Sequence, residues 1–179
     1  HAHALWGAGI INSDELAELN RGLDAIAAES ESAPCPDSDA EDLHTWLEAL
    51  LTEKVGPAGK KIHTARSRND QVATLLKMYV IAAGEELSGQ LRRLIAVGCQ
   101  RAEDWADLVF PLQTHTQFAA PGSVGFWVLR YATAFDGIRR HVDFCVSEWR
   151  RHCPLGAGAV AGSSIPIDRR LQAEGLGFE

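Results

Sequence analysis

The densest group of reactive side chains lies at residues 60–71, in the run KKIHTARSRNDQ. Two arginines and two neutral donors stand there, just before a long predicted helix: Arg66, Arg68, Ser67 and Asn69. Arginine forks and the free N–H groups of a helix start can bind a carboxylate or a phosphate. The alternative is a surface pair of Arg66 with Asp70 and a simple helix cap from Ser67 or Asn69. The residue types alone leave both interpretations open.

A second polar group surrounds His115, in the run QTHTQ between Pro111 and Pro121. Histidine can take or give a proton near neutral pH, and the neighbouring hydroxyls and amides can orient a polar substrate. A single loop histidine, taken by itself, is more often a surface or structural residue. His115 is therefore a candidate for acid–base chemistry that needs support from the rest of the sequence.

Two further patterns indicate structure more than chemistry. The glycine-rich residues 156–162 follow no strand and precede no Gly-Lys-Ser/Thr, so they are not a phosphate-binding loop. His141 and Cys145 share a helix face, and His152 and Cys153 lie close behind. Cys145 falls on an apolar seam, which favours a buried thiol over a metal ligand. We therefore expect no metal site.

Helices must position these groups, because apolar residues recur at steps of three and four and nowhere alternate cleanly with polar ones. We expect an all-α fold, a long-helix bundle with short N-terminal helices. We expect residues 1–70 to form an N-terminal helical region with the basic loop, and residues 71–179 to begin the bundle. The predicted elements are helices at 12–29, 43–56, 72–95, 122–151 and 168–175, a basic loop at 56–69 and a connector at 110–121.

The composition excludes several classes of protein. Hydrophobic residues make up 46% of the 179 residues, and the net charge of −7 argues against nonspecific binding to nucleic acid or anionic lipid. Four scattered cysteines give no disulfide framework, and no apolar run reaches the ~20 residues of a membrane helix. We expect a soluble cytoplasmic protein without nucleic-acid or membrane partners. The chain opens HAHALWGAG and closes LQAEGLGFE, so we also expect a fragment.

Three blocks of the sequence together carry a family resemblance. They are IHTARSRNDQVAT at 62–74, PLQTHTQFAAP at 111–121 and PLGAGAVAGSSIPIDR at 154–169. In order and spacing they resemble the argininosuccinate lyases of the aspartase/fumarase superfamily. The opening HAHAL and the EDLH at 41–44 are similar to N-terminal segments of that family. The resemblance covers nearly the whole chain, and the RSRNDQ block is specific within the superfamily.

The resemblance implies an all-α subunit of the aspartase/fumarase type that assembles into a homotetramer with active sites shared between subunits. It implies the reversible anti elimination of fumarate from argininosuccinate, releasing arginine in arginine biosynthesis, with no cofactor or metal. The fragment alone would be inactive. Two alternatives stay open: a non-catalytic structural relative similar to lens crystallins, and a lyase acting on another succinyl-amine.

The resemblance also assigns roles to individual residues. His115 matches the histidine implicated in proton transfer, as general acid or base. Substrate binding falls to Ser67, Arg68, Asn69 and Thr114. Supporting roles fall to Arg66, Gln117, Asp42 and His44.

The sequence departs from the family pattern at four positions. Ala65 stands where glycine is usual and Gln113 where tyrosine is common, while Phe118 and Ala120 replace residues that are usually polar. If position 65 requires a positive φ, alanine there costs energy. The family's mobile serine loop would lie beyond residue 179, so Ser163 and Ser164 are not that loop.

Overall fold

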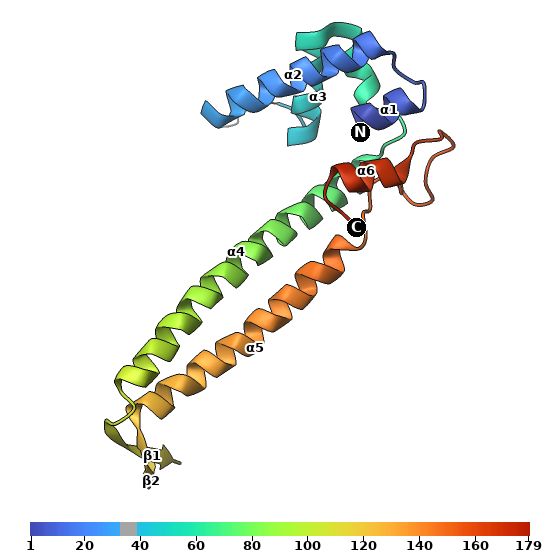
Figure 1. Cartoon of the computed structure of the whole chain (residues 1–179). Helices are drawn as coiled ribbons and strands as arrows, with labels where there is room; N and C mark the ends of the chain where they lie inside the picture. Colours follow the sequence, from blue (N-terminus) through green and yellow to red (C-terminus); the bar gives the residue numbers. More distant parts are fainter. Residues whose placement is uncertain (33–38) are drawn as a thin grey trace. The chain divides into compact units, whose positions relative to one another are not determined.

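Among the described residues, seven helices form in or next to segments where apolar residues recur at steps of three and four. Two strands form in the connector between the two long helices. The computed structural model describes residues 1–32 and 39–179. Cys35, Pro34 and Pro36 lie outside these residues. The elements are α1 (Ala2–Gly7), α2 (Ser13–Ser32), α3 (Leu43–Val55), the 3₁₀ helix η1 (Gly56–His63), α4 (Arg68–Asp104), β1 (Val109–Thr114), β2 (Gln117–Ser123), α5 (Val124–Arg150) and α6 (Arg169–Gly175) (Figure 1).

The chain divides into two compact units. One comprises His1–Leu75 and Cys153–Glu179, and the other comprises Leu76–His152. This division differs from the one expected at residue 70, because the last 27 residues belong with the N-terminal unit and do not continue the bundle. The physical reason is a set of hydrogen bonds: Asp70 accepts from the amides of Gly156 and Gly158, and Gln172 on α6 bonds to the His1 ring at 2.6 Å.

The N-terminal unit has an apolar core between its short helices. At its centre Leu5 and Leu19 are fully buried, and Leu51 and Ile62 pack in the same cluster. The start of α2 is fixed by the expected capping box. Asn12 Oδ1 accepts a hydrogen bond from the Glu15 amide at 2.9 Å, and Glu15 Oε2 accepts one from the Asn12 amide at 3.0 Å.

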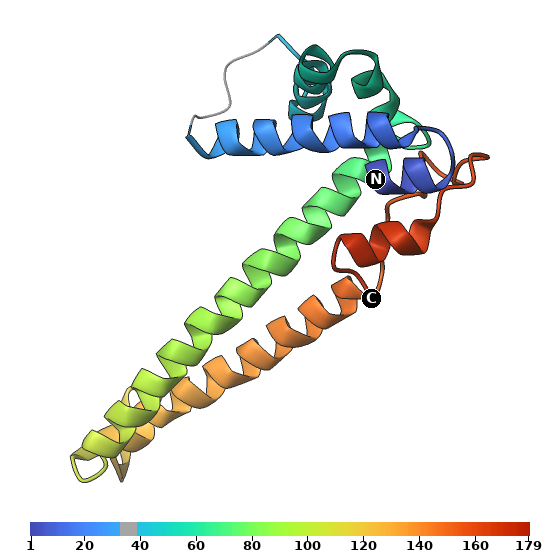
Figure 2. The same cartoon turned by 45° about the horizontal axis from the view of Figure 1, so that its top comes forward.

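In the second unit the remainder of α4 lies beside α5, with the two helices antiparallel (Figures 1 and 2). Glycines allow the close approach: a Cβ at Gly84 would lie 2.5 Å from Val146 Cγ2. Buried Ser88 on α4 donates a hydrogen bond of 2.5 Å to Asp143 on α5. Both predicted long helices are confirmed, α4 extending beyond the expected range and α5 starting at Val124.

The connector between the long helices is a β-hairpin, which the sequence did not predict. β1 and β2 pair antiparallel, with Val109 opposite Ser123 and Thr114 opposite Gln117. Nearly every strand residue is exposed, so no alternation of buried and exposed residues marks these strands in the sequence. The all-α class is confirmed, with this hairpin as the only sheet in residues 1–32 and 39–179. The basic loop expected at 56–69 begins as the 3₁₀ helix η1.

Candidate active site

The turn that opens α4 is shaped by a reciprocal helix cap. Ser67 Oγ accepts a hydrogen bond from the Asn69 amide at 3.2 Å, and Asp70 Oδ1 accepts one from the Ser67 amide at 3.0 Å. Just before it, Ala65 has φ 61°, in the left-handed region where glycine is favoured. The capping role left open for Ser67 is therefore realised, although Arg66 pairs with Glu48 and not with Asp70.

Glu48 on α3 contacts three basic side chains at or near this turn. Its Oε1 lies 2.9 Å from Arg66 Nη2, 3.1 Å from Arg68 Nη1 and 3.0 Å from His63 Nδ1. Burial alone would raise the pKa of Glu48, but the hydrogen bonds and charges of His63 and Arg68 hold that pKa below its ordinary value. Glu48 is thus an ionised carboxylate shared by two guanidinium groups and the His63 imidazole.

All three nitrogens of the Arg68 guanidinium lie close to oxygen atoms of the N-terminal unit. Its Nε lies 3.2 Å from Asp42 Oδ2, and its Nη1 donates to Gln71 Oε1 at 2.5 Å as well as to Glu48. Its Nη2 donates to Thr45 Oγ1 at 3.2 Å and to Glu48 Oε2 at 3.3 Å. Arg68 therefore binds the first turn of α4 to α3.

His44 joins the same network as a neutral imidazole. Gln71 uses its oxygen to accept from Arg68, so its amide nitrogen is the donor to His44 Nδ1, at 3.2 Å. This places the ring proton on Nε2. Burial, followed by the positive charge of Arg68, lowers the pKa of His44. His44, whose Nε2–H can donate a hydrogen bond to a ligand, is thus uncharged at neutral pH.

Asn69 differs from its neighbours. It is exposed, and its side-chain amide has no hydrogen-bond partner in the part of the chain that the structure describes. Ser67 and Arg68 are half-buried and engaged, whereas the Asn69 amide offers both a donor and an acceptor to solvent. Within this cluster, Asn69 is the sequence-predicted residue that is most available to a ligand.

Sequence reasoning missed Glu48, and it considered Asp70 only as a surface partner of Arg66. The Asp70 side chain is almost completely buried, at 3% exposure, and its Oδ2 accepts hydrogen bonds from the amides of Gly156 at 3.0 Å and Gly158 at 2.8 Å. The Ser-x-x-Asp spacing with Ser67 was a signal for the capping role of Asp70. Glu48 lies in no motif, and only the folded contacts reveal it.

Burial also acts on the second arginine. The Arg66 side chain is only 10% exposed, and burial lowers its pKa while Glu48 opposes that change. Its Nε is buried and has no hydrogen-bond partner among the described residues.

Asp42 caps α3 by accepting a hydrogen bond from the Thr45 amide at 2.6 Å, and this hydrogen bond lowers the pKa of Asp42. The predicted supporting residues Asp42, His44 and Arg66 thus form one cluster with Ser67, Arg68 and Asn69.

The other predicted site residues lie on the hairpin of the second unit. His115 and Thr116 are the two central residues of the turn, with φ 49° and 62°. A two-residue turn with both φ values positive is normally built from Asn and Gly, so this turn is strained. Thr114 and Gln117 flank it as a strand pair. His115 is exposed at the tip, and Phe118 is 77% exposed nearby.

The two groups therefore belong to different units: the basic turn to the first and the hairpin tip to the second. The structure brings the predicted residues together within each group. The proximity of Asn69 and His115 stays a prediction.

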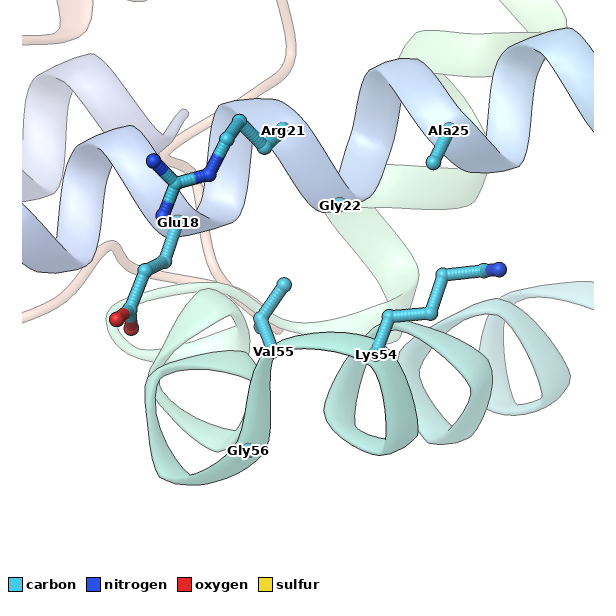
Figure 3. Close-up of a pocket in the computed structure, with 7 residues that line it drawn as sticks. All are labelled: Glu18, Arg21, Gly22, Ala25, Lys54, Val55 and Gly56. Carbon is cyan, nitrogen blue, oxygen red and sulfur yellow. The ribbon is translucent and has the colours of Figure 1, made fainter.

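A cavity of ≈ 470 Å³ lies between α2 and α3, away from every predicted site residue (Figure 3). Val55 points toward Gly22 in this cavity, where a Cβ would lie 2.5 Å from Val55 Cγ1. Lys54, also on its wall, forms an ion pair of 2.7 Å with Glu29. The lining residues of this cavity include none of the predicted site residues.

No three His, Cys, Asp or Glu side chains gather within residues 1–32 and 39–179 closely enough to hold a metal ion. Among the same residues, none of the helices combines the length and the apolarity needed to span a bilayer.

Comparison with known proteins places these features in context. The family model described as lyase matches residues 1–179. The argininosuccinate lyase of Thermus thermophilus is 42% identical over 184 residues, and that of Heliobacterium mobile is 39% identical over 180 residues. Each alignment covers 100% of this chain and 39% of the relative. The chain thus spans about two fifths of the length of the curated relatives it matches.

Solved structures share the fold at lower identity. EDDS lyase in complex with formate aligns with a TM-score of 0.87 and 24% identity, over 99% of this chain and 35% of that one. A fumarate lyase:delta crystallin from Brucella melitensis aligns with a TM-score of 0.77 and 15% identity, over 99% of this chain and 44% of that one. These likenesses support the helical architecture.

Proposed function

The chain belongs to the lyase family, and from that premise we propose that the complete protein catalyses the reversible anti elimination of fumarate from argininosuccinate. The observation that carries the proposal is the match, at 39–42% identity over the whole chain, to proteins named argininosuccinate lyase. The product arginine places the reaction in arginine biosynthesis. We propose a cytoplasmic enzyme.

The chemistry explains the residue types. A base must remove the proton from the carbon next to a carboxylate, and negative charge then accumulates on that carboxylate while the guanidino nitrogen leaves. The elimination moves a proton and an electron pair and passes no electrons to an acceptor, so it requires no redox cofactor. Hydrogen-bond donors at the carboxylate and one proton-transfer group at the reacting atoms are what the reaction needs.

His115 is our candidate for proton transfer, as general acid or base. Its exposed position on a strained two-residue turn supports this role, because strain is retained where a side chain must be presented in one direction. Thr114 and Gln117 flank it and can orient the substrate. Asn69, with its unpartnered amide, is the candidate for the substrate carboxylate.

We propose further that the active sites form between the subunits of a homotetramer. Large apolar side chains of the second unit support this, since they are exposed in the single chain: Tyr79 is 71%, Phe126 63% and Phe144 60% exposed. Burial of such residues between helices of neighbouring subunits removes them from water. Neighbouring copies can then supply His115 and Asn69 to one site.

The test is turnover by the complete protein. We expect fumarate, followed by its absorbance, to form from argininosuccinate. His115→Asn is expected to lower kcat by about 10²- to 10⁴-fold while the tetramer stays intact. His152→Asn, an exposed histidine outside both predicted groups, is the matched control and is expected to leave kcat unchanged.

Three results would contradict this assignment. No fumarate from the assembled protein would remove the lyase activity and favour a structural relative without catalysis. Fumarate from adenylosuccinate but not from argininosuccinate would favour a lyase for another succinyl-amine. Near-normal turnover by His115→Asn would remove His115 from the mechanism.

A further inference from the structure

Glu48 faces the basic turn from a different helix. It lies in the middle of α3, and the basic side chains it contacts, those of His63, Arg66 and Arg68, precede or begin α4. Its side chain is 25% exposed and that of Arg66 is 10% exposed. A carboxylate in such a place is more than a surface charge, because its removal would leave a buried guanidinium without a counter-ion.

Arg66 and Arg68 carry like charges only two residues apart. Glu48 Oε1 lies within 3.1 Å of a nitrogen of each, so its negative charge offsets the Coulomb repulsion between the two guanidinium groups. Arg66 Nε already has no partner in the described chain, and Glu48 is the counter-ion that Arg66 contacts. The path of the chain from Ala65 to Arg68 therefore depends on this carboxylate.

The contacts of Arg68 transmit that order to Asn69. Arg68 is the first residue of α4, and its fork is held on α3 by Glu48 together with Asp42. Asn69 is the next residue along the helix. Because both Nη nitrogens of Arg68 donate hydrogen bonds and Nε lies in an ion pair with Asp42, the guanidinium is built into the protein and is not held ready for a substrate carboxylate.

We propose that Glu48 and Arg68 act as one unit of positioning residues, which hold the first turn of α4 so that the Asn69 amide meets the substrate carboxylate. This inference rests on the proposed function and changes one role within it. Arg68 acts through Glu48 and does not itself bind substrate. Glu48, which no family block singles out, becomes part of the site.

A double-mutant cycle in the complete protein tests this unit. We expect Glu48→Gln and Arg68→Gln each to lower kcat/KM for argininosuccinate by about 10²-fold, the effect of a displaced contact group. The double variant is expected to lose no more than either single one, within about threefold, because both remove the same interaction. Losses that multiply to about 10⁴-fold would show that Arg68 contacts substrate independently and would overturn the proposal.

A matched control separates positioning from a general loss of charge. Glu53 lies on the same helix, is exposed and contacts no partner in the described ranges, so Glu53→Gln is expected to leave kcat/KM unchanged. A loss of folded enzyme lowers the apparent kcat and leaves KM unaltered, whereas displacement of Asn69 in folded enzyme raises KM. A normal KM in Glu48→Gln would overturn the proposal.

Two further measurements keep the test decisive. If Glu48→Gln does not fold, Arg68→Lys keeps the charge but loses the fork, and it is expected to raise KM. The side-chain amide signal of Asn69, observed by NMR after ¹⁵N-asparagine labelling, is expected to shift in Glu48→Gln while those of Asn12 and Asn20 stay in place. An unshifted Asn69 signal overturns the proposal, whether or not the wild-type protein forms fumarate. A lack of fumarate by itself would refute only the proposed function.

Discussion

Replacement of Ala65 by glycine is expected to stabilise the protein. Ala65 has φ 61°, and an L residue in the left-handed region costs about 1–2 kcal/mol, which glycine does not incur. Glycine also gains conformational entropy in the unfolded chain, which offsets about 0.4–1 kcal/mol of that gain. The net expectation is a free energy of unfolding raised by about 0.5–1 kcal/mol, or a Tm higher by about 1–4 °C.

Urea unfolding followed by tryptophan fluorescence measures this difference. Ala82→Gly is the matched control, since Ala82 is exposed in the interior of α4 and the same exchange there is expected to destabilise by about 1 kcal/mol. The two substitutions thus have opposite predicted signs. Destabilisation by Ala65→Gly of the size seen at Ala82 would refute the reasoning from backbone strain.

Other predictions concern packing, polar burial and pH. A Cβ at Gly125 would overlap the Ala102 carbonyl oxygen, so Gly125→Ala is expected to destabilise the protein by about 1–3 kcal/mol. Gly137 lies on the same helix with open space around it, so Gly137→Ala is expected to stabilise the protein by up to about 1 kcal/mol. Thermal unfolding measures both changes. Asp70→Asn places an N–H donor against backbone amides and is expected to lower the free energy of unfolding by about 1–3 kcal/mol in urea titrations; an unchanged midpoint would contradict this. Since the folded pKa of His44 is lowered, the unfolded chain binds its proton more readily, and stability should fall as pH drops below 6.5; His44→Gln should reduce that slope between pH 7.5 and 5.5, and an equal slope would argue against it.

The helices α2 to α6 were predictable because their signals are local, whereas α1 and the 3₁₀ helix η1 were not predicted. The Asn12–Glu15 capping box starts α2, and Asp168 caps α6 by accepting from the amides of Arg170 and Leu171. Apolar residues at helical spacing predicted the long helices. The hairpin was missed because its strands are exposed on both faces, so its register depends on main-chain pairing and not on a pattern of buried residues.

The candidate site was predictable only in part. The residue types of the basic turn indicated an anion site, and the structure gathers them with Asp42 and His44 from another helix. Their partners were not predictable, because Glu48 and the amides of Gly156 and Gly158 come close only in the folded chain. Sequence patterns report which side chains could bind a ligand, but not which of them the protein itself already occupies.

The N-terminal unit is discontinuous along the chain, and this orders the events of its synthesis. Asp70 leaves the ribosome 86 residues before Gly156, whose amide it binds. Until then a carboxylate destined for burial stays hydrated, and residues 76–152 have time to form their helical hairpin. That hairpin shortens the effective length of chain between the two halves of the N-terminal unit. The late joining of these halves therefore carries a smaller entropic cost.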